Sequence, residues 1–351
     1  MFTVLLLATL LLSAFTLLPL IRTDAWWIRI FDFPRVQIAV VGLGVLAGWL
    51  AMPPSSWRLA ALGVLGGCLV LQMARILPYT PLLPPQLTAA RSATSPRLSL
   101  LIANVLMTNR DTDRLLTQIH RFDPDLVFLV ETDDWWAEAM RPLHERYPHR
   151  VCRPQPNTYG MLLFSRRPLS RVEVHHLIEE DVPSIHATLT LPDGPSIDLI
   201  GVHPRPPRPD KDQDSTNRDA ELLLVARRLH RREHPTLVAG DLNDVAWSHT
   251  TRLFQRISGL LDPRRGRGLF STFPVALPWL RYPLDHIFCS PHFRLVRMER
   301  LPDVGSDHFP IFAEVAYEPE ARATHDVPSA DAEDLDESRR RIQWALGTSA
   351  P

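Results

Sequence analysis

Side chains that bind metal ions or move protons recur in this sequence beside short apolar runs. Asn104 follows the run Leu100–Ala103, and Glu131 follows Leu126–Val130. Side chains at strand ends lie in loops that a rigid sheet holds in place, where active sites are commonly built. One such residue would more simply close a strand, but a repeated pattern indicates a shared site. The further members are His203, Asp241 with Asn243, Asp285, Asp307 and His308.

These residue types suit the hydrolysis of a phosphate ester. That reaction needs neutralised charge on the phosphoryl oxygens, a positioned water and help for the leaving oxygen. Carboxylates without cysteine ligands suit a hard cation such as Mg²⁺ or Mn²⁺. A histidine paired with an aspartate can handle protons near neutral pH. The three cysteines, Cys68, Cys152 and Cys289, have neither a disulfide framework nor zinc-site spacing.

The order of these motifs resembles the endonuclease/exonuclease/phosphatase superfamily, which includes DNase I-like nucleases, inositol polyphosphate phosphatases and neutral sphingomyelinases. The resemblance covers residues 97–317, and Gly240-Asp241-Leu242-Asn243 and Ser306-Asp307-His308 are its most specific pieces. It implies an α/β fold, a four-layer sandwich of two β-sheets flanked by helices. The N-terminal region lies outside it and resembles that of membrane-anchored bacterial members. The remaining matching motifs are Asn104, Glu131, Tyr159-Gly160, His203 and Leu284-Asp285-His286-Ile287.

The resemblance also implies a role for each residue. The metal, Mg²⁺ or Mn²⁺, would be held chiefly by Glu131, with support from Asn104 and Asp307. Catalysis would fall to the residues that act on water and phosphate. Asp241 would activate the attacking water, and Asn243 would hydrogen-bond the phosphate. Asp285 would hold His308 against the phosphoryl group. His203 would bind a phosphate oxygen. Tyr159 would position Glu131 or the substrate.

One substrate contact is expected from the residues themselves. The loop Pro204–Asp210 alternates arginine and proline and would be stiff, basic and close to His203. We therefore expect Arg205 to line the rim of the substrate site. Arg218, near the start of the helix that follows this loop, is expected to be solvated.

Composition narrows the function without fixing the substrate. The formal net charge is −1, which differs from the strongly basic balance of proteins that grip nucleic acid by bulk electrostatics. We expect a phosphoester hydrolase of the phosphodiesterase or nuclease type, acting on nucleic acid, a lipid head group or a small phosphoester. The alternative is a membrane-bound scaffold that uses a hydrolase-like domain only for binding. Nothing in the sequence points to a protein partner.

Short apolar runs and two amphipathic segments predict the elements that must position these residues. Helices are expected at Thr112–Arg121 and Ser215–Arg232, whose leucines recur at helical spacing. Enrichment in Val, Ile, Leu and Phe between turn residues predicts strands. These are Leu98–Val105, Asp125–Glu131, Gly160–Ser165, Ile185–Leu191, Ile197–His203, Thr236–Leu242, Leu284–Cys289, Phe293–Leu301 and Ile311–Tyr317.

The first 78 residues are strongly apolar and predict a membrane region with three transmembrane helices, at Met1–Ile21, Val36–Met52 and Leu59–Ala74. Residues 79–96 predict an extended linker, 97–317 the catalytic domain, and 318–351 a mostly disordered tail with a short helix near Glu337–Leu346. We therefore expect a multi-pass protein of a bacterial inner or plasma membrane. An excess of arginine on the domain's side, at positions 22, 29, 35 and 75, favours a cytoplasmic catalytic domain.

Overall fold

Strand β1 (Arg97–Asn104) buries side chains on both of its faces. Leu98, Leu100 and Ile102 enter one buried cluster, whereas Leu101 and Ala103 enter another. Because successive side chains of a strand point to opposite faces, β1 must be covered on both sides. The computed structural model, which describes residues 1–191, 194–207 and 214–348, shows how this cover is built.

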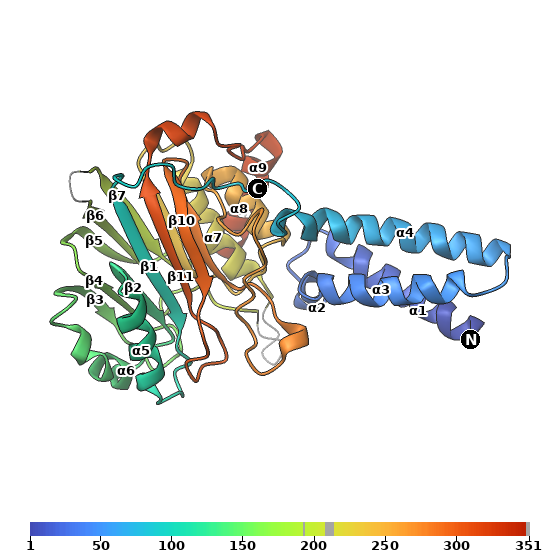
Figure 1. Ribbon diagram of the computed structural model, residues 1–351, viewed down its shortest axis with the longest axis horizontal. Coiled ribbons are helices and arrows are strands. Elements are labelled where there is room, and N and C mark those ends of the chain that lie inside the picture. Colours follow the sequence, from blue (N-terminus) through green and yellow to red (C-terminus); the bar gives the residue numbers. More distant parts are fainter. Residues whose placement is uncertain (192–193, 208–213, 349–351) are drawn as a thin grey trace.

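Two mixed sheets pack face to face (Figure 1). Within the described residues, the first sheet has six strands in the order β10-β11-β1-β2-β4-β3, and the second has five in the order β5-β6-β7-β8-β9. One pair in each sheet is parallel, β1 with β2 and β7 with β8. The other strands are β2 (Leu126–Val130), β3 (His149–Arg153), β4 (Met161–Ser165), β5 (Leu169–His176), β6 (Pro183–Thr190), β7 (Ser196–Gly201), β8 (Thr236–Asp241), β9 (Asp285–Cys289), β10 (Phe293–Arg300) and β11 (Ile311–Tyr317).

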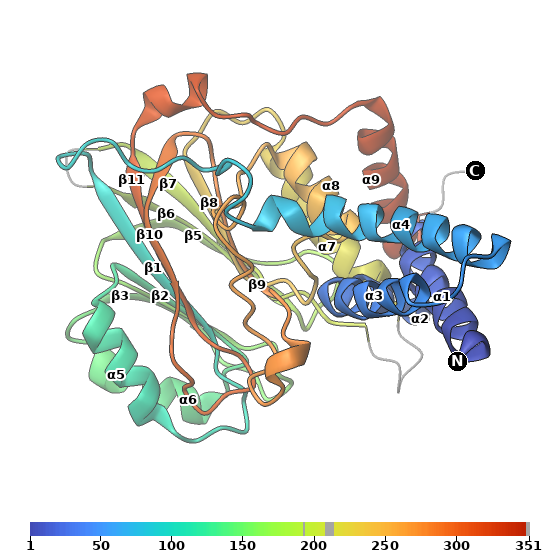
Figure 2. The ribbon, with the colours of Figure 1, turned by 45° about the vertical axis from the view of Figure 1, so that its right-hand side comes forward.

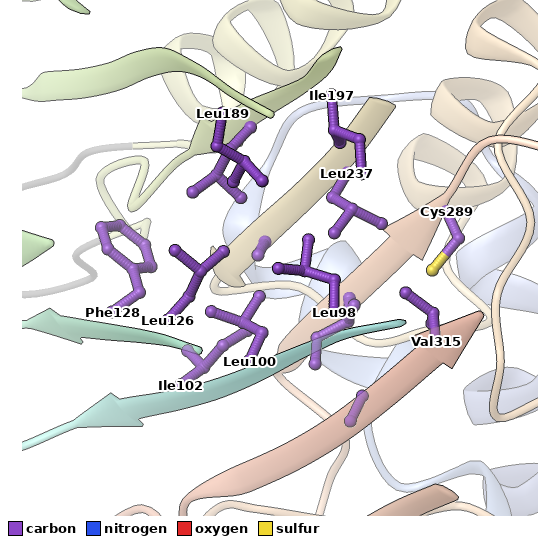
Figure 3. Close-up of a cluster of buried hydrophobic side chains, with 14 of the residues drawn as sticks. Leu98, Leu100, Ile102, Leu126, Phe128, Leu189, Ile197, Leu237, Cys289 and Val315 are labelled. Carbon is purple, nitrogen blue, oxygen red and sulfur yellow. The ribbon is translucent and has the colours of Figure 1, made fainter. Parts of the chain in front are cut away.

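Aliphatic side chains of the two sheets meet in a central core. Figure 3 shows Leu100, Ile102 and Phe128 of the first sheet facing Leu189 and Leu237 of the second. Helices cover the outer faces, with α5 and α6 on the first sheet and α7 and α8 on the second. The expected sandwich of sheets flanked by helices is therefore present. These helices are α5 (Thr112–Phe122), α6 (Asp134–Ala139), α7 (Thr216–Leu229) and α8 (His249–Ser258).

Two strands, β3 and β5, were not predicted from the sequence. Each lies at the edge of its sheet, and their sequences, HRVCR and LSRVEVHH, carry several charged or imidazole side chains. Polar and charged residues are common on edge strands because they discourage pairing with other chains. The apolar enrichment that identifies the buried strands is therefore weak there.

Three helices extend from the domain as an arm (Figures 1 and 2). They are α1 (Phe2–Leu17), α3 (Arg35–Leu50) and α4 (Ser56–Ile76), with the short α2 (Trp26–Arg29) before α3. The prediction of three transmembrane helices needs correction. Two stretches, Phe2–Leu20 and Ser56–Tyr79, are long and apolar enough to cross a membrane, and a third qualifies only if the pair Trp26–Asp32 and Arg35–Leu50, bent by 70°, counts as one span.

The second apolar run is too short because proline interrupts it at both ends. Pro34 precedes α3, and Pro53 and Pro54 follow it, so α3 has 16 residues. At about 1.5 Å per residue it reaches about 24 Å, less than the roughly 30 Å of a hydrocarbon core. Short 3₁₀ turns flank these helices: η1 (Leu18–Leu20), η2 (Ile30–Asp32) and η3 (Leu77–Tyr79).

Residues 79–96 lie against the domain. Leu87 is fully buried in the central core, and backbone hydrogen bonds join Thr88 and Ala90 to Leu295 at the exposed edge of β10. A segment predicted as an extended linker thus covers a sheet edge, which would otherwise offer unpaired backbone groups.

The tail, predicted to be mostly disordered, instead forms η7 (Pro319–Ala323) and α9 (Ala332–Ala345); its last three residues, 349–351, lie outside the described residues. Ile342 of α9 enters the core beneath α7, and Arg256 on α8 pairs with Asp334. A capping box formed by Asp331 and Asp334 starts the helix. Specific polar contacts, which low average hydropathy does not reveal, therefore order this segment. The remaining short turns are η4 (Arg141–Leu143) and η6 (Pro278–Leu280).

Candidate active site

The site forms where β1 of one sheet and β8 of the other end side by side. Asn104 is the last residue of β1 and Asp241 the last of β8. The Asn104 side-chain amide donates to Asp241 Oδ2 at 3.1 Å and to Glu131 Oε1 at 2.7 Å. These hydrogen bonds join the two sheets at the carboxyl ends of β1, β2 and β8. The three residues therefore converge as predicted.

Gly240 sets the direction in which Asp241 points. Its φ of +146° is one that residues with a side chain rarely adopt, and a Cβ there would lie 1.8 Å from the Val202 carbonyl oxygen. Asp241 itself is buried, and its Oδ1 accepts a hydrogen bond from the Asn243 amide at 2.9 Å. Burial raises the pKa of Asp241, with a further contribution from Asp285. A carboxylate with a raised pKa is a better proton acceptor.

Two histidines flank Asp241 and differ in charge. His308 Nε2 lies 3.6 Å and His203 Nε2 3.9 Å from Asp241 Oδ2. Burial lowers the pKa of His203 to about 4, and Asp241 offsets this only in part. For His308 burial acts in the same direction, but the Asp285 and Asp241 carboxylates outweigh it and raise its pKa to about 10. At neutral pH His203 is therefore neutral and His308 is an imidazolium.

Asp285 holds His308 in place. His308 Nδ1 donates to Asp285 Oδ2 at 2.8 Å, and both residues are buried. Ligand atoms of Asp241, Asp285 and His308 lie within 4.8 Å of one another, a spacing that could hold a metal ion. Because His308 and Asp285 are already hydrogen-bonded to each other, however, we interpret this trio as an ion-paired cluster.

Glu131 fits a divalent cation better. It follows β2 with φ at +59°. Burial raises its pKa to about 7; the Asn104 hydrogen bond and His308 oppose this increase, whereas the Asp241 and Asp307 carboxylates add to it. Carboxyl oxygens crowded in this way are stabilised by a hard cation that neutralises their repulsion. Asn104 turns its amide nitrogen toward the carboxylates while its oxygen accepts from the Leu106 amide. Asn104 would have to turn its amide to act as a ligand.

The expected substrate-binding residues lie around His203. The rings of Tyr159 and His203 are 5.7 Å apart, and the Arg205 guanidinium covers Tyr159 at 4.5 Å. Arg205 also pairs with Asp181 and Glu179, so its charge is already matched. Asn243 donates from its side chain to the Pro204 carbonyl oxygen at 3.0 Å. Of the loop Pro204–Asp210, residues 208–210 lie outside the described residues.

Arg218, expected to be solvated, is instead fully buried beneath the Asp241–Asn243 loop. It donates to the Asn243 carbonyl oxygen at 2.8 Å and pairs with Asp219 at 2.7 Å. Asp244, the residue after Asn243, contacts both Arg218 and Arg29, at 3.4 Å each. Arg218 therefore positions the loop. Only the proximity of Asp219 in sequence hints at its pairing.

Arg29 of the N-terminal arm completes this buried charge cluster. It is 5% exposed and lies 3.6 Å from Asp219 and 3.4 Å from Asp244. Arg341 on α9 reaches the same Asp219 at 3.1 Å. The arm, the tail helix and the Asp241–Asn243 loop thus share one set of ion pairs, a link that no local sequence pattern could indicate.

Comparison with known proteins supports the fold assignment. A model of the Endonuclease/Exonuclease/phosphatase family matches residues 101–308, well over half of the chain. No curated protein matches the chain. Among solved structures, D. rerio TDP2 complexed with a single-strand DNA product is 19% identical, with a TM-score of 0.51 over 62% of this chain and 98% of that one.

Two further structures are similar to the same extent. The human nocturnin catalytic domain with a bound sulfate anion is 18% identical, with a TM-score of 0.51 over 64% of this chain and 96% of that one. The mannosyl-6-phosphatase of Bacteroides thetaiotaomicron is 16% identical, with a TM-score of 0.51 over 63% of this chain and all of that one. At such low identities the likeness is one of fold.

Proposed function

Because this chain belongs to the endonuclease/exonuclease/phosphatase family, we propose that it is a divalent-metal-dependent hydrolase of phosphoester bonds, anchored to a membrane by its N-terminal helices. The proposal rests on one observation, the buried cluster in which Asn104, His203 and His308 surround Asp241. Buried ionisable groups with displaced pKa values are costly to maintain and gather at functional sites.

The metal would be held by Glu131, with Asp307 and Asn104 completing its surroundings. When bound, Mg²⁺ or Mn²⁺ would supply positive charge beside the phosphoryl oxygens. Glu131 is suited to this task because its carboxyl group is crowded by Asp241 and Asp307, and a hard cation prefers such oxygen ligands.

The protein's own side chains divide the remaining work. Asp241 accepts the proton of the attacking water, a role that its raised pKa favours. His308, held as an imidazolium by Asp285, neutralises charge on the phosphoryl group. Neutral His203 donates a hydrogen bond to a phosphate oxygen, and Asn243 orients the phosphate.

Substrates of the structural neighbours guide the choice of test compounds. One neighbour holds a DNA product and another is a sugar phosphatase, so both diesters and monoesters belong in the panel. We favour the diester class, phosphodiesterase or nuclease, and a location in a bacterial inner or plasma membrane with the domain on the cytoplasmic side. Tyr159 and Arg205, beside His203, are the proposed substrate contacts.

The test uses the full chain purified in detergent. Hydrolysis of bis-p-nitrophenyl phosphate, p-nitrophenyl phosphate, single-stranded DNA and phospholipid vesicles is measured with Mg²⁺ or Mn²⁺, and again with EDTA, which should abolish it. We expect Asp241→Asn and His308→Ala to lower kcat by about 10²–10⁴. The exposed positions Asp113 and His176 supply matched controls, Asp113→Asn and His176→Ala, which should retain full activity. Absence of turnover on every compound would favour the scaffold alternative.

A further inference from the structure

A cationic cavity lies where the N-terminal arm meets the domain. Its volume is about 280 Å³. Among the described residues, its wall contains six arginines and His249 but one acidic residue, Asp32. We call it the junction cavity. The arginines are Arg22, Arg29, Arg35, Arg75, Arg252 and Arg256.

Four of these arginines already have carboxylate partners. Arg29 and Arg35 pair with acidic residues buried in the protein, while Arg22 pairs with Glu333 and Arg256 with Asp334. His249 contacts Glu337 at 2.8 Å. The acidic side chains in these pairs are therefore already neutralised. Asp32, the acidic residue in the cavity wall, pairs with Arg35.

Arg75 and Arg252 are different, because neither has a carboxylate within ion-pair distance among the residues that the structure describes. Arg252 donates from Nε to the Trp247 and Ser248 carbonyl oxygens. Burial lowers its pKa to about 10, and Arg75 and Arg256 contribute to the decrease. Two guanidinium groups without carboxylate partners therefore face a shared cavity in mutual repulsion, an arrangement that an anion would stabilise.

The cavity lies level with the ends of both candidate spans. Residues 19–22 follow α1, Arg75 belongs to the last turn of α4, and Arg252 and Arg256 come from α8 of the domain. Figure 2 shows α4 leaving the domain beside α8. In a membrane-anchored chain this is the boundary between hydrocarbon and water. Basic pockets at that depth bind the phosphates of lipid head groups.

We propose that the junction cavity binds the phosphate of an anionic membrane lipid. This inference rests on the membrane anchoring proposed above but not on hydrolysis. A lipid suits the cavity better than a free anion, because Leu20 and Ile21 on its rim are 46% and 53% exposed. Those side chains would contact the glycerol and upper acyl chains while the arginines hold the phosphate.

The test measures lipid binding to the full chain in detergent by native mass spectrometry and by the shift in thermal unfolding. The probes are phosphatidylglycerol, phosphatidylcholine and inorganic phosphate. We expect phosphatidylglycerol to bind and to raise the unfolding temperature. The double variant Arg75→Gln/Arg252→Gln should bind it about 25-fold more weakly, about fivefold for each arginine.

Neither arginine gives up a carboxylate partner in the variant, but Arg252→Gln loses the hydrogen bonds to the Trp247 and Ser248 carbonyl oxygens. The shift caused by lipid is therefore measured against each chain's own unfolding temperature without lipid. Without added lipid, the double variant should still unfold in one cooperative transition, which checks that it is folded. Arg58→Gln is the matched control: it lies on the same helix at the opposite end and should change binding less than twofold.

Equal binding of phosphatidylglycerol by the native chain and the double variant would overturn the proposal. So would protection by inorganic phosphate alone with none from the lipid, which would assign the cavity to a soluble anion. Equal affinity for phosphatidylcholine would also contradict a site for anionic lipid. Because none of these readouts uses turnover, a failure of the hydrolase proposal would leave this test intact.

Discussion

Two histidines lie within 4 Å of the same Asp241 oxygen, yet their pKa values move in opposite directions. The cause is the second carboxylate: His308 donates to Asp285, whereas His203 Nδ1 is buried without a hydrogen-bond partner among the described residues. The site can thus hold a neutral histidine, His203, beside a positively charged one, His308. The difference between their pKa values depends on Asp285.

This difference predicts opposite effects of pH on stability. The pKa of His308 is raised from 6.5 to about 10 by folding, so its contribution is fully present below pH 6.5 and is lost as the pH rises through 10. His203 has a lowered folded pKa, about 4, so the stability it contributes as a neutral group is present above pH 6.5 and lost as the pH falls toward 4.

The measurement is the free energy of unfolding of the full chain in detergent with EDTA, from pH 4 to about pH 10. The deficit of His308→Gln relative to the native chain should shrink toward high pH, and that of His203→Gln toward low pH. Parallel curves for the two variants would show that the site does not hold them in different charge states.

Residue types and their order along the chain are enough to predict most of the side chains that meet around Asp241, because phosphoryl chemistry needs particular groups. Alternation along a strand also predicts that His286 points away from Asp285, and its ring does face Arg264 and the Asp244 carbonyl oxygen. The prediction for Arg218 is wrong. A charged residue near a helix start is usually solvated, and its burial under Asp244 is a tertiary effect.

At the scale of secondary-structure elements, the ends of the strands determine the geometry of the site. The parallel pairs β1–β2 and β7–β8 deliver Asn104, Glu131 and Asp241 to one region. Most strands were predictable from their apolar residues, including the edge strands β9 and β10, but the polar edge strands β3 and β5 were not. Gly240 needs this backbone conformation because the carbonyl group of Val202, the residue after β7, leaves no room for a side chain.

Gly240→Ala should therefore displace Asp241. The new Cβ would overlap the Val202 carbonyl oxygen, and a φ of +146° is strained for alanine. We expect a loss of at least about 2 kcal/mol in unfolding free energy and a decrease of at least about tenfold in kcat.

Gly44→Ala provides the comparison, because nothing lies within 4 Å of a Cβ at that position. It should leave kcat unchanged and should not lower the unfolding free energy, because alanine is a better helix former than glycine. Native kcat in Gly240→Ala would mean that the strand end tolerates rotation and that Asp241 is not held by its backbone.

Across the whole molecule, ions buried at the junction tie the N-terminal arm to the domain. Arg29 contacts Asp219 and Asp244, and Asp24 contacts Arg341 on α9. Composition separates an apolar arm, a soluble domain and a polar tail, but it cannot show that charges join them. Such pairs bring together residues up to 317 positions apart, which no local pattern records.

Arg29→Met should leave Asp219 and Asp244 short of positive charge. Breaking a buried pair in this way costs about 3–5 kcal/mol, measured by denaturant unfolding of the full chain in detergent. Because Asp244 adjoins Asn243, kcat should fall as well. Arg22→Met removes an exposed pair with Glu333 and should cost less than about 1 kcal/mol; a similar loss in both variants would refute a special role for Arg29.

Within residues 79–96, Thr88 and Ala90 bond to the edge of β10 and Leu87 is buried in the core, so this segment is not a slack tether. A catalytic domain on a flexible linker would move through a large volume above the bilayer. In the membrane-anchored arrangement proposed above, this domain would keep a constant height and tilt, so substrates would have to come to the site. Lateral diffusion of the arm, rather than swinging of the domain, would then set the area that each copy can serve.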